Sequence, residues 1–293
     1  MASTSSTVIN TNTPAPRIVT TNEKVTGPPA AEVLRRSGIA LSRTGEIRVL
    51  DNACGGGILM SELLKLASQH PDTMKLDRPV AGDIDEKMLG YVRSKQTDGS
   101  FAMQESWQKV EVMKIDQQSI PLPDGSFTHV FSNFGIFFCQ DDEKALSEAY
   151  RVLQAGGTVG FTTWKIIAWW SDIALPALAR YIPDAPSLPS PGQLFPPRGW
   201  SDPGAILAKL EKAGFDDIQV SEYSFTPDVE AEDFAEATAV LTKIVAKKGW
   251  SEEQIARFAD QVEPALLRYM KETFKDGKWD GKMTAIITLA KRP

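Results

Sequence analysis

The chain has 293 residues, 42% of them hydrophobic, which is enough for one large α/β domain or two small ones. Its 32 basic and 38 acidic residues give a net charge of −6, and the basic ones form no cluster, so nucleic acid is not an expected partner. The two cysteines lack the spacing of a metal site or disulfide framework, and no segment has the roughly 18 apolar residues of a membrane span. We therefore expect a soluble, cytoplasmic monomer or homodimer without a metal or a membrane partner.

Strands and helices alternate through the first half of the chain. Residues 1–18 are polar and lack the apolar run of a secretory signal, so we expect a flexible tail there and a single domain over 19–293. The expected elements up to residue 164 are a short helix at 29–37, a strand at 46–53, a helix at 58–69, a strand near Val80, a helix through Met88 and Val92, strands at 109–116 and 127–134, a helix at 141–155 and a strand at 158–164. This alternation predicts a mostly parallel α/β sheet with helices on both faces.

The second half of the chain departs from this alternation of strands and helices. Residues 166–203 are dense in Pro and Trp, so we expect an irregular insertion there. A helix at 204–215, a strand at 216–225, two or three helices within 230–274 and a final strand from Met283 complete the chain. The segments 165–203 and 230–280 are expected to form a lid on the substrate side of the sheet.

The motif VLDNACGGG, residues 49–57, places a carboxylate and three adjacent glycines at the end of a strand. Such a turn at the carboxyl end of a parallel strand lets backbone approach a ligand. A dinucleotide would need the spacing G-x-G-x-x-G, whereas three bulky residues follow the glycines here. The motif therefore disfavours a nicotinamide-dependent oxidoreductase. It favours S-adenosylmethionine, whose ammonium group Asp51 could receive directly or through water, although Asp51 considered alone could equally be a helix cap.

Two further strand ends carry carboxylates suited to the same ligand. Asp83, in GDIDEKML, can accept hydrogen bonds from both ribose hydroxyls. Asp116, in KIDQQSIPLPDGSFTHVF, can accept from the exocyclic amine of adenine, while the backbone N–H of Gln117 reaches a ring nitrogen. Three successive strand ends thus predict a site for S-adenosylmethionine.

Four ordered motifs between residues 46 and 164 resemble those of class I S-adenosylmethionine-dependent methyltransferases: VLDNACGGG, GDIDEKML, ID…LPDGSFTHVF and EAYRVLQAGGTVGFTTW. Segments further along resemble a fungal small-molecule group that includes the gliotoxin bis-thiomethyltransferase, so the likeness covers nearly all of the chain after about Val19. The resemblance implies a Rossmann-like sheet of seven strands with the last strand antiparallel, and a helical or irregular lid.

The resemblance also implies which residues contact the cofactor. Thr26, in a segment before the first expected helix, would contact the methionine carboxylate. The other implied contacts are Asp51, Asn52, Ala53, Cys54, Gly55, Asp83, Ile84, Met88, Asp116, Gln117 and Asn133.

No side chain is an obvious catalytic base or nucleophile. His129 lies within an expected strand and His70 at a helix end, so both are expected to be structural. Cys54 has no basic partner nearby and is expected to pack rather than react. Asp141 or Asp142 could act as a base, although their place at a helix start favours capping. Acceptors that are ionised or rich in lone pairs near neutral pH are therefore favoured.

Aromatic residues follow the strands expected at 127–134 and 158–164, and we expect Phe134 and Trp164 to position a flat or apolar acceptor. The expected activity is methyl transfer by in-line displacement to O, S or N of an apolar small molecule, as in fungal secondary metabolism. Two alternatives stay open: a methyltransferase-like regulator that binds the cofactor without turnover, and a protein that uses the cofactor in a non-methylating reaction.

Overall fold

The computed structural model of the chain describes residues 17–41, 45–99, 101–188 and 199–293. Within these ranges, seven strands form one sheet in the order β3-β2-β1-β4-β5-β7-β6. β7 pairs antiparallel with β5 and β6, whereas the other neighbouring strands pair in parallel. The structure therefore confirms the expected fold class, a Rossmann-like α/β sheet of the class I methyltransferase type whose last strand is antiparallel.

The bounds of the elements match most of the sequence predictions. The strands are β1 (Val49–Asn52), β2 (Val80–Asp83), β3 (Glu111–Lys114), β4 (Phe127–Asn133), β5 (Leu153–Ile166), β6 (Asp216–Phe225) and β7 (Met283–Lys291). The α-helices are α1 (Arg17–Ser37), α2 (Ile58–Gln69), α3 (Glu86–Thr97), α4 (Gln104–Trp107), α5 (Asp142–Val152), α6 (Leu175–Tyr181), α8 (Pro203–Lys212), α9 (Ala231–Gly249) and α10 (Glu252–Thr273). Short helical turns are η1 (Ile39–Leu41), η2 (Ile136–Phe138) and η3 (Trp170–Ala174).

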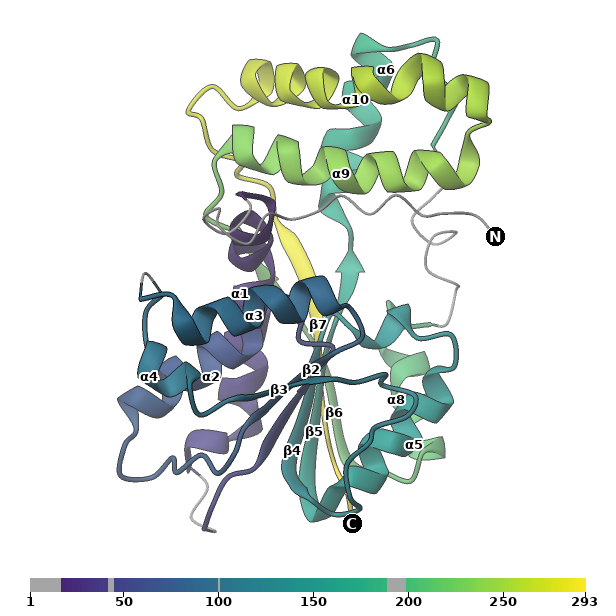
Figure 1. Cartoon of the computed structure of the whole chain (residues 1–293). Helices are drawn as coiled ribbons and strands as arrows, with labels where there is room; N and C mark the ends of the chain where they lie inside the picture. Colours follow the sequence, from purple (N-terminus) through teal and green to yellow (C-terminus); the bar gives the residue numbers. More distant parts are fainter. Residues whose placement is uncertain (1–16, 42–44, 100, 189–198) are drawn as a thin grey trace.

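Helices cover both faces of the sheet because successive strand residues point to opposite sides. Val49 and Leu50 of β1 are both buried but belong to different hydrophobic cores. The core around Val49 includes Leu63 of α2, on the face that α1, α2 and α3 cover (Figure 1). The core around Leu50 includes Leu146 of α5, on the face that α5 and α8 cover.

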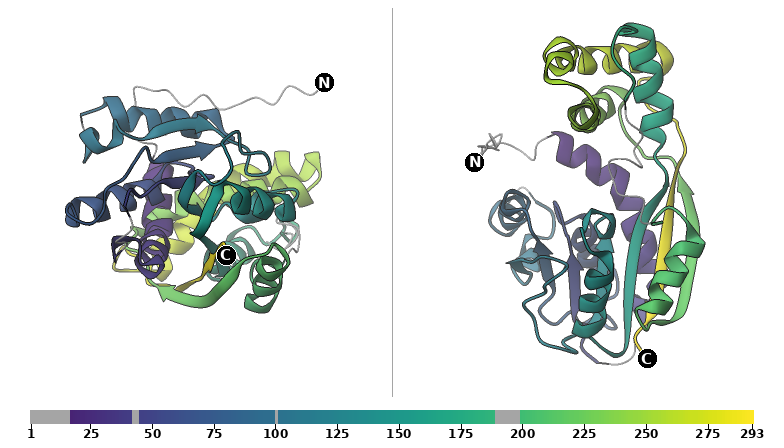
Figure 2. Two further views of the ribbon diagram at one scale, coloured as in Figure 1. Left: turned by 90° about the horizontal axis from the view of Figure 1, so that it is seen from below. Right: turned by 90° about the vertical axis from the view of Figure 1, so that its right-hand side faces the viewer.

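A third hydrophobic core lies beyond the carboxyl ends of the parallel strands. It is formed by η3, α6, α9 and α10, and Figure 2 shows these helices as a layer at one end of the molecule. The prediction of two or three helices within 230–274 is confirmed by α9 and α10. No helix in the described ranges combines the length and the apolar content needed to cross a membrane.

The prediction of an irregular segment over 166–203 is wrong for its first part. The π-helical turn η3 and helix α6 occupy residues 170–181, while 189–198 lie outside the described residues. Trp170 and Ile173 are buried in the third core, and this burial favours helical backbone. Pro176 lies in the first turn of α6, directly after the π-helical turn, in which the N–H of Leu175 donates to the carbonyl of Trp170.

The first helix is much longer than predicted. The prediction placed its start at Pro29, but α1 begins at Arg17 and runs through both Pro28 and Pro29. Tertiary contacts stabilise the added turns, since Val25 is buried in the third core and Glu23 forms an ion pair with Lys95. Of the expected N-terminal tail, residues 1–16 lie outside the described residues.

The helix predicted over 141–155 ends earlier, at Val152, and β5 begins at Leu153 instead of residue 158. The backbone of Gly156 and Gly157 forms two hydrogen bonds with that of Arg292, which follows β7. Pairing with the end of β7 therefore draws the glycines into β5, so they do not close the helix.

Candidate active site

The order in which the chain adds strands reverses between β1 and β4. The strands β2 and β3 lie on one side of β1, whereas β4 and β5 lie on its other side. Ligands of open α/β sheets bind at the carboxyl ends of the strands beside such a point. The residues predicted to contact the cofactor all lie on this edge or border it. Asp51, Asn52, Asp83 and Asn133 are at strand ends, Ala53, Cys54, Gly55, Ile84, Asp116 and Gln117 directly follow strands, Met88 is in the first turn of α3, and Thr26 of α1 contacts Asn133.

In the glycine turn after β1, every second residue from Ala53 to Gly57 has a left-handed backbone conformation. Ala53, Gly55 and Gly57 have φ angles of 61°, 52° and 81°, and Gly57 is the N-cap of α2. A left-handed alanine is strained by about 1–2 kcal/mol, and such strain is often found at functional sites. Sequence analysis did not identify this feature of Ala53, because alanine gives no local signal for a positive φ.

Asp51 lies beneath the turn and is completely buried. Its Oδ2 accepts a hydrogen bond of 3.2 Å from the backbone N–H of Met60, whereas its Oδ1 is buried and has no hydrogen-bond partner among the residues that the structure describes. Burial raises the pKa of Asp51 to about 7, and the nearby Asp83 adds to this rise. A buried acceptor without a donor is suited to a cation or to a water that bridges to one.

Asp83 joins the end of β2 to the glycine turn. Its Oδ2 accepts from the N–H of Gly55 at 2.8 Å, and its Oδ1 accepts from the N–H of Asp85 at 2.9 Å. Each carboxylate oxygen has a second lone pair, so both can also accept from hydroxyl groups. The next side chain, Ile84, is 61% exposed and offers an apolar surface beside the carboxylate.

Asp116 and Gln117 follow β3. Asp116 Oδ1 accepts from the backbone N–H of Gln118 at 2.9 Å, which fixes the carboxylate at the sheet edge. The side chain of Gln117 is buried and bonded to Ser132 and to the carbonyl of Gly135. These bonds occupy the side chain of Gln117, so its predicted contact with a ligand is through the backbone N–H.

Asn133 connects the end of β4 to α1. Its Nδ2 donates to the carbonyl of Thr26 at 3.3 Å, and its Oδ1 accepts from the hydroxyl of Thr162 at 2.6 Å. Thr26 lies inside α1, not before the first helix as predicted, and its hydroxyl donates to the Asn22 carbonyl at 2.8 Å. Both side chains are therefore engaged with protein groups, and the Thr26 hydroxyl would have to give up its bond to Asn22 to donate to a carboxylate.

Phe134 and Trp164 stack on each other at the ends of β4 and β5. Their ring centroids are 4.0 Å apart with planes 21° apart, and the ring centroid of Phe225 in β6 lies 6.5 Å from that of Trp164. Phe134 is buried, whereas Trp164 is partly exposed. Of this pair, Trp164 has the larger share of surface available to a ligand.

Neither histidine lies on the carboxyl edge. His129 pairs with Val49, the first residue of β1, and burial lowers its pKa to about 4. His70 follows the last residue of α2, whose first residue is beside the glycine turn, so a helix of 12 residues separates it from the site. Burial raises the pKa of Cys54, which therefore stays a thiol at neutral pH.

The two candidate acidic bases have structural partners. Asp141 caps α5, because its Oδ1 accepts from the N–H of Lys144 at 2.9 Å. Asp142 accepts from the indole N–H of Trp200 at 2.8 Å and lies 3.0 Å from Lys209. Among the described residues, no group of three or more His, Cys, Asp or Glu side chains is placed to hold a metal ion.

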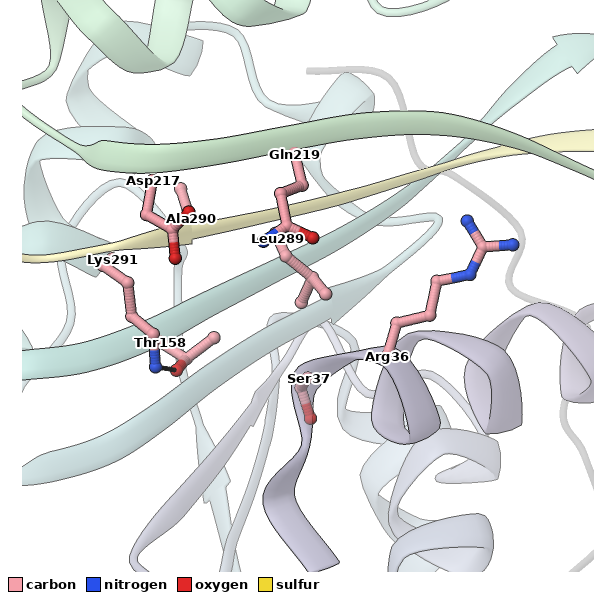
Figure 3. Close-up of a pocket in the computed structure, with 8 residues that line it drawn as sticks. All are labelled: Arg36, Ser37, Thr158, Asp217, Gln219, Leu289, Ala290 and Lys291. Atoms are coloured by element: carbon pink, nitrogen blue, oxygen red, sulfur yellow. Dashed lines mark hydrogen bonds between the residues drawn. The ribbon is translucent and has the colours of Figure 1, made fainter. Parts of the chain in front are cut away.

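A small cavity lies near the opposite edge of the sheet. Its volume is about 40 Å³, and its lining includes Arg36, Thr158, Asp217 and Lys291 (Figure 3). Lys291 donates to the Thr158 hydroxyl at 2.6 Å. Thr158 pairs with Lys291, whereas Ile166 at the carboxyl end of β5 pairs with Thr284, so this cavity is separate from the candidate site.

The known proteins that this chain resembles are all methyltransferases in the comparisons below. Residues 50–161 match the family described as methyltransferase domain. Methyltransferase tpcH of Aspergillus fumigatus is 30% identical, over 90% of this chain and 91% of its own length. Methyltransferase ktnA of Aspergillus niger is 31% identical, over 90% of both chains. The acetylaranotin bis-thiomethyltransferase of Aspergillus terreus is 29% identical, over 86% of this chain and 84% of its own length.

The fold, the strand-end carboxylates and these relatives define a class I methyltransferase. The chain belongs to this methyltransferase family, and it is an S-adenosylmethionine-dependent enzyme.

Proposed function

We propose that this enzyme transfers the methyl group of S-adenosylmethionine to an S, O or N atom of an apolar small molecule of the secondary-metabolite type. The bound cofactor supplies a methyl group that its sulfonium already makes electrophilic. The protein then has to orient the acceptor in line with that methyl group and exclude water. Both histidines lie away from the carboxyl edge of the sheet, and this observation supports a mechanism without a dedicated base.

The carboxylates at the carboxyl edge of the sheet match the hydrogen-bond donors of the cofactor. We propose that Asp51 receives the ammonium group through its unpartnered oxygen, that Asp83 accepts from the ribose hydroxyls, and that Asp116 accepts from the adenine amine. Ile84 would cover the adenine with its exposed side chain. The remaining contacts would come from Thr26, Asn52, Ala53, Cys54, Gly55, Met88, Gln117 and Asn133.

Exposed apolar side chains at the strand ends support an apolar acceptor. Phe138 of η2, after β4, is 65% exposed, and Ile166, the last residue of β5, is 52% exposed. Large apolar side chains with this exposure usually mark a binding surface when they gather at one edge. With Trp164 they offer an apolar wall for the acceptor beside the proposed position of the methyl donor.

The name of one relative supports a heteroatom acceptor. The acetylaranotin bis-thiomethyltransferase acts, by its name, on two thiol groups. A thiol that ionises near neutral pH needs no enzymatic base. Acidic phenols and carboxylic acids also ionise at or below neutral pH, and an unprotonated amine has a free lone pair, so all four acceptor classes belong to the proposal.

The test is the pH dependence of the rate with acceptors of different acidity. A series of aromatic thiols and phenols that differ only in ring substituents would be assayed by formation of S-adenosylhomocysteine at saturating cofactor. If the acceptor ionises without help, the acid limb of kcat/KM moves with the pKa of each acceptor. One fixed limb for the whole series would instead reveal an enzymatic base. No turnover with any member, despite cofactor binding, would favour a regulator or a non-methylating reaction.

A further inference from the structure

Lys95 of α3 is a buried cation beside the glycine turn. Its side chain is 3% exposed, and its Nζ lies 2.9 Å from Oε1 of Glu23 in α1 and 3.4 Å from the hydroxyl of Ser61 in α2. The rings of Tyr91, Phe101 and Trp107 surround the ammonium group, with centroids 5.0, 5.9 and 5.2 Å away. A buried ammonium group needs a counter-charge, so Glu23 is tightly coupled to Lys95.

The first turns of α1 lie against the glycine turn itself. A Cβ atom added at Gly56 would lie 3.1 Å from Val19 of α1 and 3.3 Å from the Tyr91 ring. Tyr91 also belongs to the aromatic group around Lys95. The Glu23–Lys95 pair is the one ion pair that joins α1 to another element in the part of the chain that the structure describes. It therefore anchors α1 next to the backbone that would hold the cofactor.

Two prolines divide α1 into halves with different surroundings. Pro28 and Pro29 lack an N–H, so the carbonyls of Lys24 and Val25 have no donor four residues ahead, and the helix is weakened there. The second half is fixed in the sheet core, where Ala30, Val33 and Leu34 are completely or almost completely buried. Movement of the first half about the prolines would leave that core intact, and would draw Val25 out of the third core.

We propose that the Glu23–Lys95 ion pair is a latch that positions the first half of α1 over the glycine turn and sets how fast the cofactor is bound and released. This inference rests on the proposed position of the cofactor. Glu23 and Lys95 are positioning residues, since they act on the cofactor through α1 and need not touch it. Opening of the latch exposes the turn for exchange, and closing shields it from water during transfer.

The test uses S-adenosylhomocysteine as the probe, so it needs no acceptor. Its dissociation constant and dissociation rate would be measured for the unmodified protein, for Glu23→Gln, for Lys95→Met and for the double variant. We expect each single variant to release the probe about tenfold faster, and the double variant to be no worse than either single one, because one shared pair is lost. Hydrogen exchange in residues 19–27 should rise in the same variants, while α2 stays protected.

The matched control is Arg93→Met, which removes a cation from the same helix but breaks only the exposed pair with Glu86. It should leave the release rate unchanged. If Lys95→Met does not fold, the release rate of Glu23→Gln alone tests the latch. Release at the unmodified rate from Glu23→Gln would overturn the latch while leaving the cofactor site intact. Failure of the unmodified protein to bind the probe would instead refute the cofactor position, and the latch with it.

Discussion

At the scale of single residues, Asp51 couples the cofactor site to pH. Desolvation by burial raises its pKa to about 7 from an ordinary value of 3.8, and the hydrogen bond from Met60 opposes part of that rise. Because the folded pKa lies above the unfolded one, the folded state holds an extra proton between these two values. Ionisation of Asp51 therefore costs stability as pH rises from about 4 to 7, unless a cation is bound beside it.

This pKa predicts a pH-dependent affinity for the cofactor. In the proposed binding mode the ammonium group pairs with ionised Asp51, so lowering the pH through about 7 should weaken binding of S-adenosylhomocysteine by up to about tenfold per pH unit. The measurement is a series of calorimetric titrations from about pH 5.5 to 8. Asp51→Asn, which cannot ionise, should bind weakly with a flat profile. A steep profile that survives in Asp51→Asn would show that another group is responsible.

The strand-end carboxylates could be predicted from the sequence because their signals are local. Asp51, Asp83 and Asp116 each follow a short β-rich run, and parallel strands bring such ends to one edge. The Glu23–Lys95 pair could not be predicted, since its partners are 72 residues apart in the sequence and nothing near either one indicates the other. The left-handed backbone of Ala53 was missed because the turn, and not the side chain, imposes it.

At the scale of elements, Asp142, a candidate base in the sequence, holds neighbouring segments together. It connects α5 to α8 through Trp200 and Lys209, and its side chain is largely buried. Loss of the carboxylate leaves a buried indole N–H and an ammonium group without this acceptor. Such losses typically cost about 1–3 kcal/mol each when the remaining group stays buried.

Asp142→Ala should therefore lower the free energy of unfolding by about 2–3 kcal/mol and leave kcat unchanged in the folded protein. Urea denaturation would give the stability, and initial rates well below the unfolding transition would give the activity. Asp141→Ala, which removes only an exposed cap, should cost about 1 kcal/mol and serves for comparison. A large fall in kcat for Asp142→Ala at unchanged stability would restore its assignment as a base.

Elements with strong periodicity were predicted well, and elements that depend on tertiary contacts were not. The predicted helix at 58–69 and strand at 216–225 match α2 and β6. The prolines of α1 and the proline-rich segment before residue 203 favour irregular structure locally. Burial of Val25 and Trp170 in the third core outweighs that preference, which is why α1 and η3 are helical.

At the scale of the whole molecule, we propose that the arrangement separates binding of the donor from binding of the acceptor. The sheet edge carries the carboxylates, and α9 lies between α10 and that part of the molecule (Figure 1). Val240, Leu241 and Ile244 of α9 are 36–49% exposed, so the helical layer also presents apolar surface. We propose that segments 165–203 and 230–280 act as a lid over an apolar acceptor held at the sheet edge.

The most direct test of this account is the mass of the product. The purified enzyme would be incubated with trideuteromethyl-labelled S-adenosylmethionine and a panel of apolar thiols, phenols, amines and carboxylic acids, with Asp83→Ala as the control. The account predicts a product in which one trideuteromethyl group has replaced a proton on S, O or N, and predicts its loss in Asp83→Ala. Label found on carbon, or no labelled product while the cofactor binds, would contradict the proposed transfer to a heteroatom.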